Sequence, residues 1–328
     1  MSTRIGKLTV FFEEPFWVGV FEQIEDGKLS VSKVTFGAEP KDCEIYEYVL
    51  KYYNSLRFSP AIETVVKEEV KNPKKRQKEI HKQIIELVKK TKKFILNREM
   101  VLDVKERGIA DYVTQVDITV QNFLKEELFI LAPDIRFLGE ETGLQNMNAD
   151  SFWILNPVDR TTNLMHDYQH SVVSLALCQQ DEIVMGIVYD PFREDIFYAM
   201  KGKGSFLNGQ PIHVSNVGKL SDTMIGIGTA KRELADENFA RFRRVFGQCQ
   251  DIRRIGSAAL ELAYTACGRQ GGYFEIYLNP WDYAAGMLLI QEAGGKVTDF
   301  MGGDLNPRKG GSVVGTNGYI HTELLQLL

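Results

Sequence analysis

The chain has 328 residues, of which 44% are hydrophobic and 25% are charged, and its formal net charge is −5. These values are ordinary for a globular protein, and the length is sufficient for two domains with a sizeable core. The acidic balance argues against a general nucleic-acid-binding protein, because phosphate backbones attract basic surfaces.

Cysteine usage and apolar runs indicate the compartment. The four cysteines are scattered without a Cys-x-x-Cys pair, so we expect free thiols rather than disulfides or a zinc site. The first residues lack a signal-peptide pattern, and no apolar run reaches the length that spans a membrane. We therefore expect a cytoplasmic protein that makes no membrane contact.

The beginning of the chain predicts a small antiparallel sheet. Runs rich in β-branched and aromatic residues indicate strands at residues 7–12, 16–24 and 29–36. Asp26-Gly27, between the second and third runs, is a strong hairpin signal. The apolar spacing over residues 45–53 is helical. We therefore predict a three-stranded β-meander with one packed helix.

Five segments of this module carry a family resemblance: Phe16-Trp17-Val18-Gly19-Val20, Phe36-Gly37-Ala38-Glu39-Pro40, Tyr46-Glu47, Leu56-Arg57-Phe58-Ser59 and Asn72-Pro73-Lys74-Lys75. Residues 1–78 resemble the YjdF family of small bacterial proteins. The biochemical role of that family is poorly defined, so the resemblance implies a module without an assigned activity. The aromatic residues favour packing within the small sheet over a binding surface.

A basic run extends over residues 67–82, where seven Lys and Arg residues are interleaved with three Glu residues. A contact with phosphate or RNA is one interpretation of this run. The mixed signs and the lack of interleaved aromatic residues favour a solvated helix face near the domain junction.

The second module, residues 79–328, begins with an amphipathic helical pattern over residues 80–95. A buried-type strand at residues 135–138 is followed directly by Glu140 and Glu141. Two adjacent carboxylates at such a place repel each other unless a cation is present. A capping box would account for one of them, but less easily for the pair.

Acidic residues also follow two other predicted elements. Residues 153–163 read as a strand end, a Pro-containing turn with Asp159, and a Thr- and Asn-rich helix start. Asp282 follows Pro280 in the first turn of a helix that ends at Gly294-Gly295. Each feature alone fits an ordinary helix cap. Together, such carboxylates suit Mg²⁺, whose usual partner is a phosphate and which can activate water.

Several motifs, in order over about 250 residues, resemble the inositol monophosphatase family. The resemblance implies an α and β fold built as a layered α-β-α-β-α sandwich, Mg²⁺-dependent hydrolysis of a small phosphate ester, and a homodimer. The motifs are Asp111-Tyr112-Val113-Thr114 with Asp117, Gly139-Glu140-Glu141-Thr142, Trp153 to Asn163, Lys201-Gly202-Lys203-Gly204-Ser205-Phe206 with Asn208-Gly209, Gly256-Ser257-Ala258-Ala259, and Trp281-Asp282-Tyr283-Ala284-Ala285-Gly286 with Glu292-Ala293-Gly294-Gly295.

The family's roles can be transferred to matching positions. The resemblance implies that Glu140 binds a first metal and helps to activate water, and that Thr161, paired with Asp117, completes this activation. Asp159 and Asp282 would hold a second metal. The remaining implied metal residues are Glu141, for a weaker third ion, Asn156 and Val158.

The implied substrate residues lie in three of the motifs. Backbone amides around Arg160 and Thr162 would bind the phosphate, and Ser257 and Ala258 lie near the same pocket. Glu275 would contact substrate hydroxyls. His166 and His170 match no catalytic position, so we expect them to be surface or structural residues.

Three positions depart from the family pattern. Asn156 stands where an aspartate normally bridges two metals, and Arg160 stands where a glycine lets the backbone approach the phosphate. Gly271 replaces an aspartate near the substrate edge, for which simple loop variation is the alternative explanation. The first two changes together add two positive charges, which is the charge of one Mg²⁺.

Two functional hypotheses follow. In the first, the chain is a phosphatase for an inositol, sugar or polyol phosphate, with a weakened metal site. In the second, the guanidinium of Arg160 partly replaces a metal, and the protein binds phosphate esters in a regulatory role but hydrolyses them poorly. The retained acidic residues favour the first hypothesis, whereas Asn156 and Arg160 favour the second.

Overall fold

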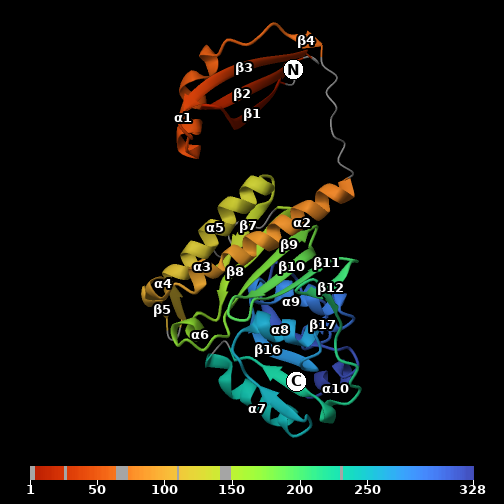
Figure 1. The fold of residues 1–328 in the computed structure, drawn as a ribbon. Coiled ribbons are helices and arrows are strands. Elements are labelled where there is room, and N and C mark those ends of the chain that lie inside the picture. The colour runs from red at the N-terminus through yellow and green to blue at the C-terminus, as the bar shows by residue number, and fades with distance from the viewer. Residues whose placement is uncertain (1–3, 26–27, 64–72, 109–110, 141–148, 230–231) are drawn as a thin grey trace. The chain divides into compact units, whose positions relative to one another are not determined.

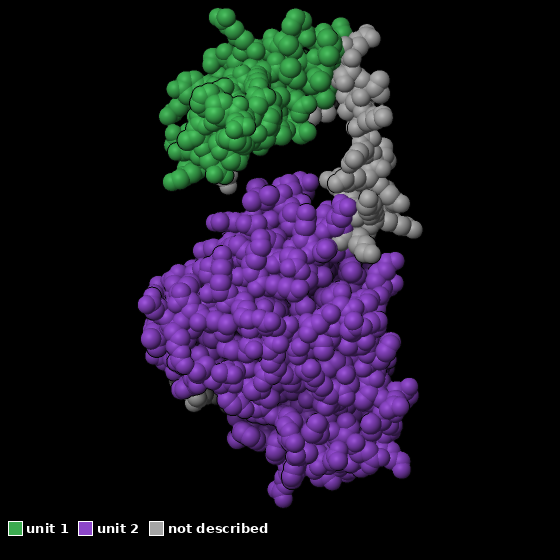
Figure 2. All heavy atoms as spheres, in the orientation of Figure 1, with its two compact units in different colours: residues 1–76 green, residues 77–328 purple. Residues whose placement is uncertain are grey.

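A computed structural model of the protein describes residues 4–25, 28–63, 73–108, 111–140, 149–229 and 232–328 (Figure 1). The chain divides into two compact units, residues 1–76 and 77–328 (Figure 2). Among the described residues, no helix combines the length and the apolar composition needed to cross a bilayer.

The first unit is an antiparallel sheet with a helix. The predicted three-stranded meander and its helix are confirmed, and their register pairs Glu13 with Phe16 and Glu25 with Lys28. The predicted Asp26-Gly27 turn lies outside the described residues. A short fourth strand was not predicted, because two residues are too few to show an alternating pattern. The elements are β1 (Arg4–Glu13), β2 (Phe16–Glu25), β3 (Lys28–Gly37), α1 (Asp42–Tyr52) and β4 (Ile62–Glu63).

Aromatic side chains join the helix of this unit to its sheet. Phe21, on β2, is buried and lies with its ring centroid 6.4 Å from that of Tyr48 and 5.9 Å from that of Tyr53. In contrast, Tyr46 and Leu50 lie on the outer side of α1 and are 66% and 67% exposed. The unit therefore buries little apolar surface for its size.

The second unit contains a two-stranded, a seven-stranded and a five-stranded sheet. The two-stranded sheet pairs β5 (Val104–Gly108) with β6 (Asp111–Thr114). The seven-stranded sheet has the order β13-β12-β11-β10-β9-β8-β7, and the five-stranded sheet has the order β15-β14-β16-β18-β17. Their strands are β7 (Arg136–Gly139), β8 (Ser151–Asp159), β9 (Val172–Gln179), β10 (Glu182–Asp190), β11 (Asp195–Met200), β12 (Gly204–Leu207), β13 (Gln210–Ile212), β14 (Met224–Ile227), β15 (Asp251–Arg253), β16 (Gly272–Leu278), β17 (Lys296–Thr298) and β18 (Gly311–Thr316).

Helices cover these two large sheets and fill the space between them (Figure 1). One face of the seven-stranded sheet packs against α2 and α5, and α8 and α9 lie between the two sheets. The outer face of the five-stranded sheet packs against α7 and α10. The predicted α-β-α-β-α sandwich is therefore confirmed. The helices are α2 (Pro73–Lys90), α3 (Lys92–Ile95), α4 (Arg98–Leu102), α5 (Gln115–Leu131), α6 (Thr161–Met165), α7 (Ala235–Phe246), α8 (Ala258–Ala266), α9 (Pro280–Glu292) and α10 (His321–Leu325).

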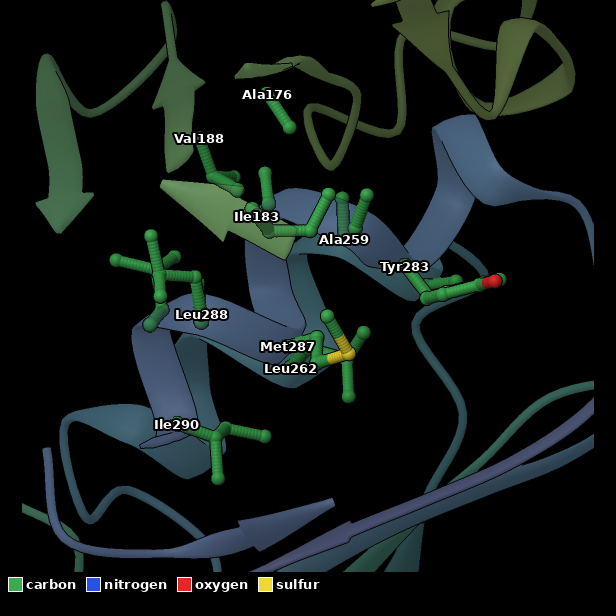
Figure 3. Packing of buried hydrophobic residues seen from close by; sticks show 14 of the residues in the cluster. Ala176, Ile183, Val188, Ala259, Leu262, Tyr283, Met287, Leu288 and Ile290 are labelled. Atoms are coloured by element: carbon green, nitrogen blue, oxygen red, sulfur yellow. The ribbon is translucent and has the colours of Figure 1, made fainter. Parts of the chain in front are cut away.

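The layer between the sheets is an apolar core in which α9 is buried on all sides. Met287, Leu288 and Ile290 of α9 point in different directions and all contact the same cluster (Figure 3). A helix enclosed in this way has no polar face, which explains why its sequence lacks an amphipathic pattern. Because α9 cannot shift freely, the residues at its start are held firmly relative to the sheet.

Gly186 of β10 allows α9 to lie directly on the sheet. A Cβ atom at this position would lie 2.7 Å from the carbonyl oxygen and 3.0 Å from the Cα atom of Ala285. We expect Gly186→Ala to lower the free energy of unfolding by about 2 kcal/mol or more, because backbone atoms cannot move aside as a flexible side chain can. Urea denaturation measures this effect. The matched substitution Gly311→Ala, where a Cβ would meet nothing within 4 Å, should change stability far less.

Candidate active site

An irregularity in β8 directs two polar side chains to the same side of the sheet. Phe152 and Ile154 point toward the layer of α8 and α9, whereas Leu155 points to the opposite face. The pairing with β9 shifts register between Asn156 and Asp159. Asn156 keeps the direction of Ile154, and the shift turns Asp159 to the same side, where their side chains meet.

Val158 takes the opposite direction. Its side chain is buried in the core beneath α2 and α5, so only its carbonyl oxygen is available as a metal ligand. That carbonyl oxygen lies 3.4 Å from Oγ1 of Thr161.

Two of the acidic residues are positioned by capping boxes. Thr114 caps α5 and Asp117 is the third residue of that helix. Asn279 and Asp282 have the same relation in α9. Each carboxylate accepts the backbone N–H of its capping residue, at 2.8 Å for Asp117 and 2.9 Å for Asp282. The other oxygen of each carboxylate remains for contacts in the site.

The structure brings Thr161 and Asp117 together as a hydrogen-bonded pair. The Thr161 hydroxyl donates to Oδ1 of Asp117 at 2.9 Å. Burial raises the pKa of Asp117, and hydrogen bonds from Thr114 and Thr161 partly offset that rise. Because the hydroxyl proton points to Asp117, the oxygen of Thr161 is oriented to accept a hydrogen bond from a neighbouring water.

The amide of Asn156 links two carboxylates. Its Nδ2 donates to Oδ1 of Asp282 at 3.0 Å and to Oδ1 of Asp159 at 3.3 Å. Its Oδ1 is buried and has no hydrogen-bond partner among the described residues. The amide group therefore stands between the two acids and keeps one buried oxygen unsatisfied, which is unfavourable unless a cation or water reaches it.

Asp159 is held by the start of α8. Its Oδ2 accepts 2.6 Å and 2.8 Å hydrogen bonds from the Ser257 hydroxyl and the Ala259 N–H. Burial raises the pKa of Asp159, whereas these donors and the charge of Arg160 lower it. These three opposing contributions favour the ionised form of Asp159.

Asp282 has fewer donors and more negative neighbours. Burial raises its pKa well above the ordinary value, and the charges of Asp159 and Glu140 raise it further. Only the Asn279 N–H and the Asn156 amide offset this effect. The pKa values of Asp159 and Asp282 are therefore both raised, and a cation bound between the two carboxylates would relieve the cause.

The donor set fits a divalent cation, although with reduced charge. Among the described residues, no three Asp, Glu, His or Cys side chains form a metal-binding group. Asn156 is neutral, and Glu141 lies outside the described residues. Nδ2 of Asn156 lies against Asp159 and Asp282, so turning this amide over would direct its oxygen, which has no partner among the described residues, to the two carboxylates. Three such oxygen donors would suit Mg²⁺.

Arg160 adopts a backbone conformation that favours glycine. Its φ is 74° and its ψ is 67°, in the left-handed region. The side chain packs beside Gly256, where an added Cβ would lie 3.4 Å from both Cγ and Nε of Arg160. Within the described part of the chain the guanidinium has no hydrogen bond or ion pair, and its charge remains available for an anion.

The other implied substrate residues lie on three elements. Thr162 is the second residue of α6, and Ala258 is the first residue of α8. Glu275, on β16, is buried and accepts a hydrogen bond from the Tyr273 hydroxyl. A Cβ at Gly228 would lie 1.9 Å from the same Glu275 carboxylate, so the neighbouring loop passes closely over it.

The structure gives no catalytic contact to Gly271, His166 or His170 among the described residues. A Cβ at Gly271 would lie 2.5 Å from Cγ2 of Thr223, so close packing favours glycine there. His166 is exposed. Nδ1 of His170 lies 2.6 Å from the carbonyl oxygen of Tyr168, which fits a structural role for this side chain.

Sequence reasoning missed three contributors to the site. The Ala259 N–H binds Asp159, and the signal for it was the serine N-cap at Ser257, which places free amides at the start of α8. Tyr273 was detectable because residues two apart on a strand share a face with Glu275. Nothing in the sequence indicated that Glu261 is buried, because a lone acid within an apolar helix is ordinarily expected at the surface.

Removing the Ser257 hydroxyl should destabilise both α8 and the site. This hydroxyl accepts the Leu260 N–H at 3.2 Å and donates to Asp159. We expect Ser257→Ala to lower the free energy of unfolding by about 2 kcal/mol, from a lost cap and a lost charge-assisted hydrogen bond. Urea denaturation tests this, with Ser174→Ala as the control, because that buried hydroxyl binds only a carbonyl oxygen. Equal losses in the two variants would contradict the assigned role.

Comparison with known proteins identifies the second unit. A model of the inositol monophosphatase family matches residues 72–328. The chain belongs to the inositol monophosphatase family. Within it, the chain is 40% identical over 232 residues to an inositol-1-monophosphatase of Rhizobium meliloti, covering 69% of this chain and 86% of the relative. It is also 41% identical over 211 residues to a Nus factor SuhB of Xylella fastidiosa, covering 64% and 76%.

Solved structures of the inositol monophosphatase family share this architecture. The SuhB protein of Bartonella henselae superimposes with a TM-score of 0.70 and 34% identity, covering 76% of this chain and 98% of that protein. An inositol monophosphatase of Thermotoga maritima gives a TM-score of 0.69 and 30% identity, covering 76% and 96%. At the other end, residues 8–108 match a family described as a protein of unknown function, DUF2992, which is the YjdF-like module.

Proposed function

We propose that the protein is a Mg²⁺-dependent phosphomonoesterase that hydrolyses an inositol phosphate or a related sugar or polyol phosphate. Membership of the inositol monophosphatase family supports phosphatase chemistry. The observation that carries the proposal is the convergence on Asn156, whose amide contacts Asp159 and Asp282 beside the Thr161–Asp117 pair.

Mg²⁺ would be held by oxygen donors on two elements, β8 and α9. Asp159, Asp282 and the amide oxygen of Asn156 provide the donors, and Glu140 adds negative charge nearby. The bound ion would stabilise developing charge on the phosphate and favour ionisation of a water. Without it, the Asn156 amide donates to both carboxylates and so reduces the repulsion between them.

The chain itself would orient the reactants. The Thr161 hydroxyl, directed by Asp117, accepts a hydrogen bond from a water and so aims the water's lone pair at phosphorus. The N–H groups of Thr161 and Thr162, in the first turn of α6, have no intrahelical acceptor and would bind phosphate oxygens. Glu275 would accept hydrogen bonds from the hydroxyl groups of a polyol.

Two residues are expected to weaken the metal site. Asn156 supplies a neutral ligand and donates hydrogen bonds to the two carboxylates that a cation would need. The Arg160 guanidinium adds a positive charge that lowers the pKa of Asp159, which shows that it acts on the same group. Both residues therefore compete with Mg²⁺ for negative charge.

Metal titration tests the proposal. The wild-type protein is titrated with Mg²⁺ by calorimetry, and inorganic phosphate release is measured from a panel of inositol, sugar and polyol phosphates at each Mg²⁺ concentration. We expect release that rises with Mg²⁺ and requires concentrations well above the micromolar range. Phosphate release that is unchanged by a chelator would contradict a Mg²⁺-dependent enzyme.

A second candidate is a phosphate-ester-binding or regulatory protein that hydrolyses poorly. The observations that favour it are the neutral Asn156 and the Arg160 guanidinium, which has no hydrogen-bond or ion-pair partner among the described residues and whose charge lowers the pKa of Asp159. Several relatives are named Nus factor SuhB rather than phosphatase, so family membership alone leaves the activity open. This candidate predicts that inorganic phosphate binds without Mg²⁺ and that phosphate release is absent at every Mg²⁺ concentration.

We further propose that the protein is a cytoplasmic homodimer whose ligand is a small phosphate ester rather than a nucleic acid. The basic run over residues 67–82 lies partly outside the described residues, and its net effect is offset by the overall charge of −5. Light scattering coupled to size-exclusion chromatography distinguishes a dimer from a monomer.

A further inference from the structure

Glu261 is an acidic residue buried inside the second unit. It lies on α8, its side chain is 1% exposed, and it belongs to none of the acid clusters described above. A buried carboxylate is unfavourable unless hydrogen bonds compensate for the lost hydration. Its neighbours therefore indicate why the fold retains it.

Two donors face the Glu261 carboxylate, one for each oxygen. The Ile255 backbone N–H donates to Oε1 at 3.0 Å, and Nε2 of Gln270 donates to Oε2 at 3.0 Å. Gly226 of β14 leaves room for this pair, because a Cβ there would lie 2.4 Å from Oε2 and 2.7 Å from Nε2 of Gln270. The pocket is thus shaped for a carboxylate that only accepts hydrogen bonds.

Ile255 connects this buried carboxylate to the phosphatase motif. Its N–H is bound by Glu261, and its carbonyl oxygen accepts a 2.8 Å hydrogen bond from Nδ2 of Asn163. Asn163 belongs to α6, directly after the Arg160 and Thr161 positions. One residue therefore joins α8 to α6, although the two helices are far apart in the sequence.

The next two residues of the chain touch the site itself. Gly256, with φ of +94°, lies against the Arg160 side chain. Ser257 then donates to Asp159. The segment from Ile255 to Ser257 is therefore held at its start by Glu261 and ends on a carboxylate of the site.

We propose that Glu261 is a positioning residue that fixes the segment 255–257, so that Ser257 holds Asp159 and Gly256 supports Arg160. The effect on Mg²⁺ affinity rests on the proposed function. The effect on the segment itself does not.

The charged groups around Glu261 are consistent with this role. The pKa of Glu261 is raised to about 7: burial raises it most, Glu275 on β16 also raises it, and the Ile255 N–H, Gln270 and the charge of Arg254 partly offset the rise. Because both oxygens face donors, protonation would place an O–H group against an N–H group and remove one hydrogen bond. The two donors therefore favour the ionised carboxylate, whereas burial favours the protonated form.

Glu261→Gln tests the proposal with little change in shape. In this variant one side-chain oxygen at position 261 becomes an NH₂ group. This donor would then face the NH₂ group of Gln270, which in the wild type donates to the Glu261 carboxylate. The double variant Glu261→Gln with Gln270→Glu restores one acceptor and one donor between the two side chains. Thr91→Val is the matched control, because it removes a buried hydroxyl-to-carbonyl hydrogen bond that involves neither Glu261 nor Gln270.

Two measurements separate this inference from the proposed function. Hydrogen–deuterium exchange of the peptide spanning residues 253–260 reports the segment directly and needs no metal. Calorimetric titration with Mg²⁺ reports Asp159. In Glu261→Gln we expect amide exchange at Ile255 to accelerate about tenfold and Mg²⁺ affinity to fall about tenfold, with partial recovery of both in the double variant.

The outcomes are distinct. Unchanged exchange in Glu261→Gln, or the same acceleration in Thr91→Val, would overturn the positioning role. Faster exchange with unchanged Mg²⁺ affinity would overturn the connection to Asp159. If the wild-type protein binds no Mg²⁺, the proposed function fails, and the exchange data with the double-variant rescue still decide whether Glu261 fixes the segment.

Discussion

Replacing Asn156 by aspartate should raise the affinity for Mg²⁺ at least about tenfold and should destabilise the metal-free protein. The substitution removes the amide group that donates to Asp159 and Asp282 and places a third carboxylate between them. Oδ1 of Asn156, which is buried and has no partner among the described residues, is replaced by an oxygen of a negatively charged carboxylate. The loss in free energy of unfolding is expected to be about 2–3 kcal/mol without metal.

Thermal unfolding with EDTA and with Mg²⁺, together with calorimetry, measures both effects. The melting temperature of Asn156→Asp should lie below that of the wild type in EDTA and should rise more steeply with Mg²⁺. Asn156→Leu, which is similar in size and cannot bind a cation, is the control for lost hydrogen bonds. A melting temperature in EDTA equal to that of the wild type would show that the amide does not shield the two acids.

A second substitution toward the family pattern, Arg160→Gly, has two effects, one on backbone strain and one on charge. Glycine relieves a left-handed conformation that costs about 1 kcal/mol for other residues, and it removes the charge beside Asp159. Phosphate release by the Asn156→Asp, Arg160→Gly double variant should therefore exceed that of the wild type. Equal and high phosphate release by the wild type and the double variant would contradict the hypothesis that Asn156 and Arg160 impair the site.

The pH dependence of stability should reveal two buried groups with opposite effects. His321 is 1% exposed, and burial and the charge of Lys296 lower its pKa from 6.5 to about 4. Thr298 donates its proton to a carbonyl, so its oxygen accepts from Nε2, and Nδ1 is left to accept from Thr316. The folded protein therefore holds a neutral ring while the unfolded chain is protonated below pH 6.5. Stability from His321 is complete above pH 6.5 and is lost as the pH falls to about 4, by about 3 kcal/mol in total.

The contribution of Glu261 to stability changes with pH in the opposite direction to that of His321. The folded-state pKa of Glu261, about 7, exceeds the ordinary 4.5, so the folded protein binds the extra proton between these values. Stability is highest below pH 4.5 and falls as the pH rises through 7, again by about 3 kcal/mol. The two groups therefore partly cancel between pH 4.5 and 6.5 in the wild type.

Single variants should expose each contribution. Urea denaturation in EDTA at several pH values gives the free energy of unfolding relative to the wild type. His321→Asn should gain relative stability as the pH falls from 7 to 4, and Glu261→Gln should gain it as the pH rises from 4.5 to 7.5. Two variants whose differences from the wild type stay constant with pH would contradict both pKa shifts.

Local signals predicted the ends of elements well. Pro280 predicted a helix with Asp282 in its first turn, and Asp282 is the third residue of α9. The capping boxes of Thr114 with Asp117 and of Asn279 with Asp282 have the local three-residue spacing but were not predicted. The hairpin strands of the first unit and the apolar run of β8 were similarly readable, because alternation and turn residues are encoded within a few positions.

Contacts between distant elements could not be read in the same way. The direction of the Asn156 amide depends on Asp282, which lies 126 residues away. The burial of Glu261 depends on Gly226 and Gln270, which belong to other elements. No local pattern distinguishes a buried acid from an exposed one, since the partners that compensate for its charge are supplied only by the tertiary fold.

The capping boxes also affect how mutations of this protein would act in a cell. Asp117 and Asp282 each secure the first turn of a helix through a backbone N–H, besides facing the site. A mutation at either position would fray that helix and increase the fraction of unfolded chains that proteases remove. A fall in cellular activity would then have two causes, a lower amount of folded protein and a lower rate per folded molecule. Only the rate per folded molecule would measure the chemical contribution of the acid.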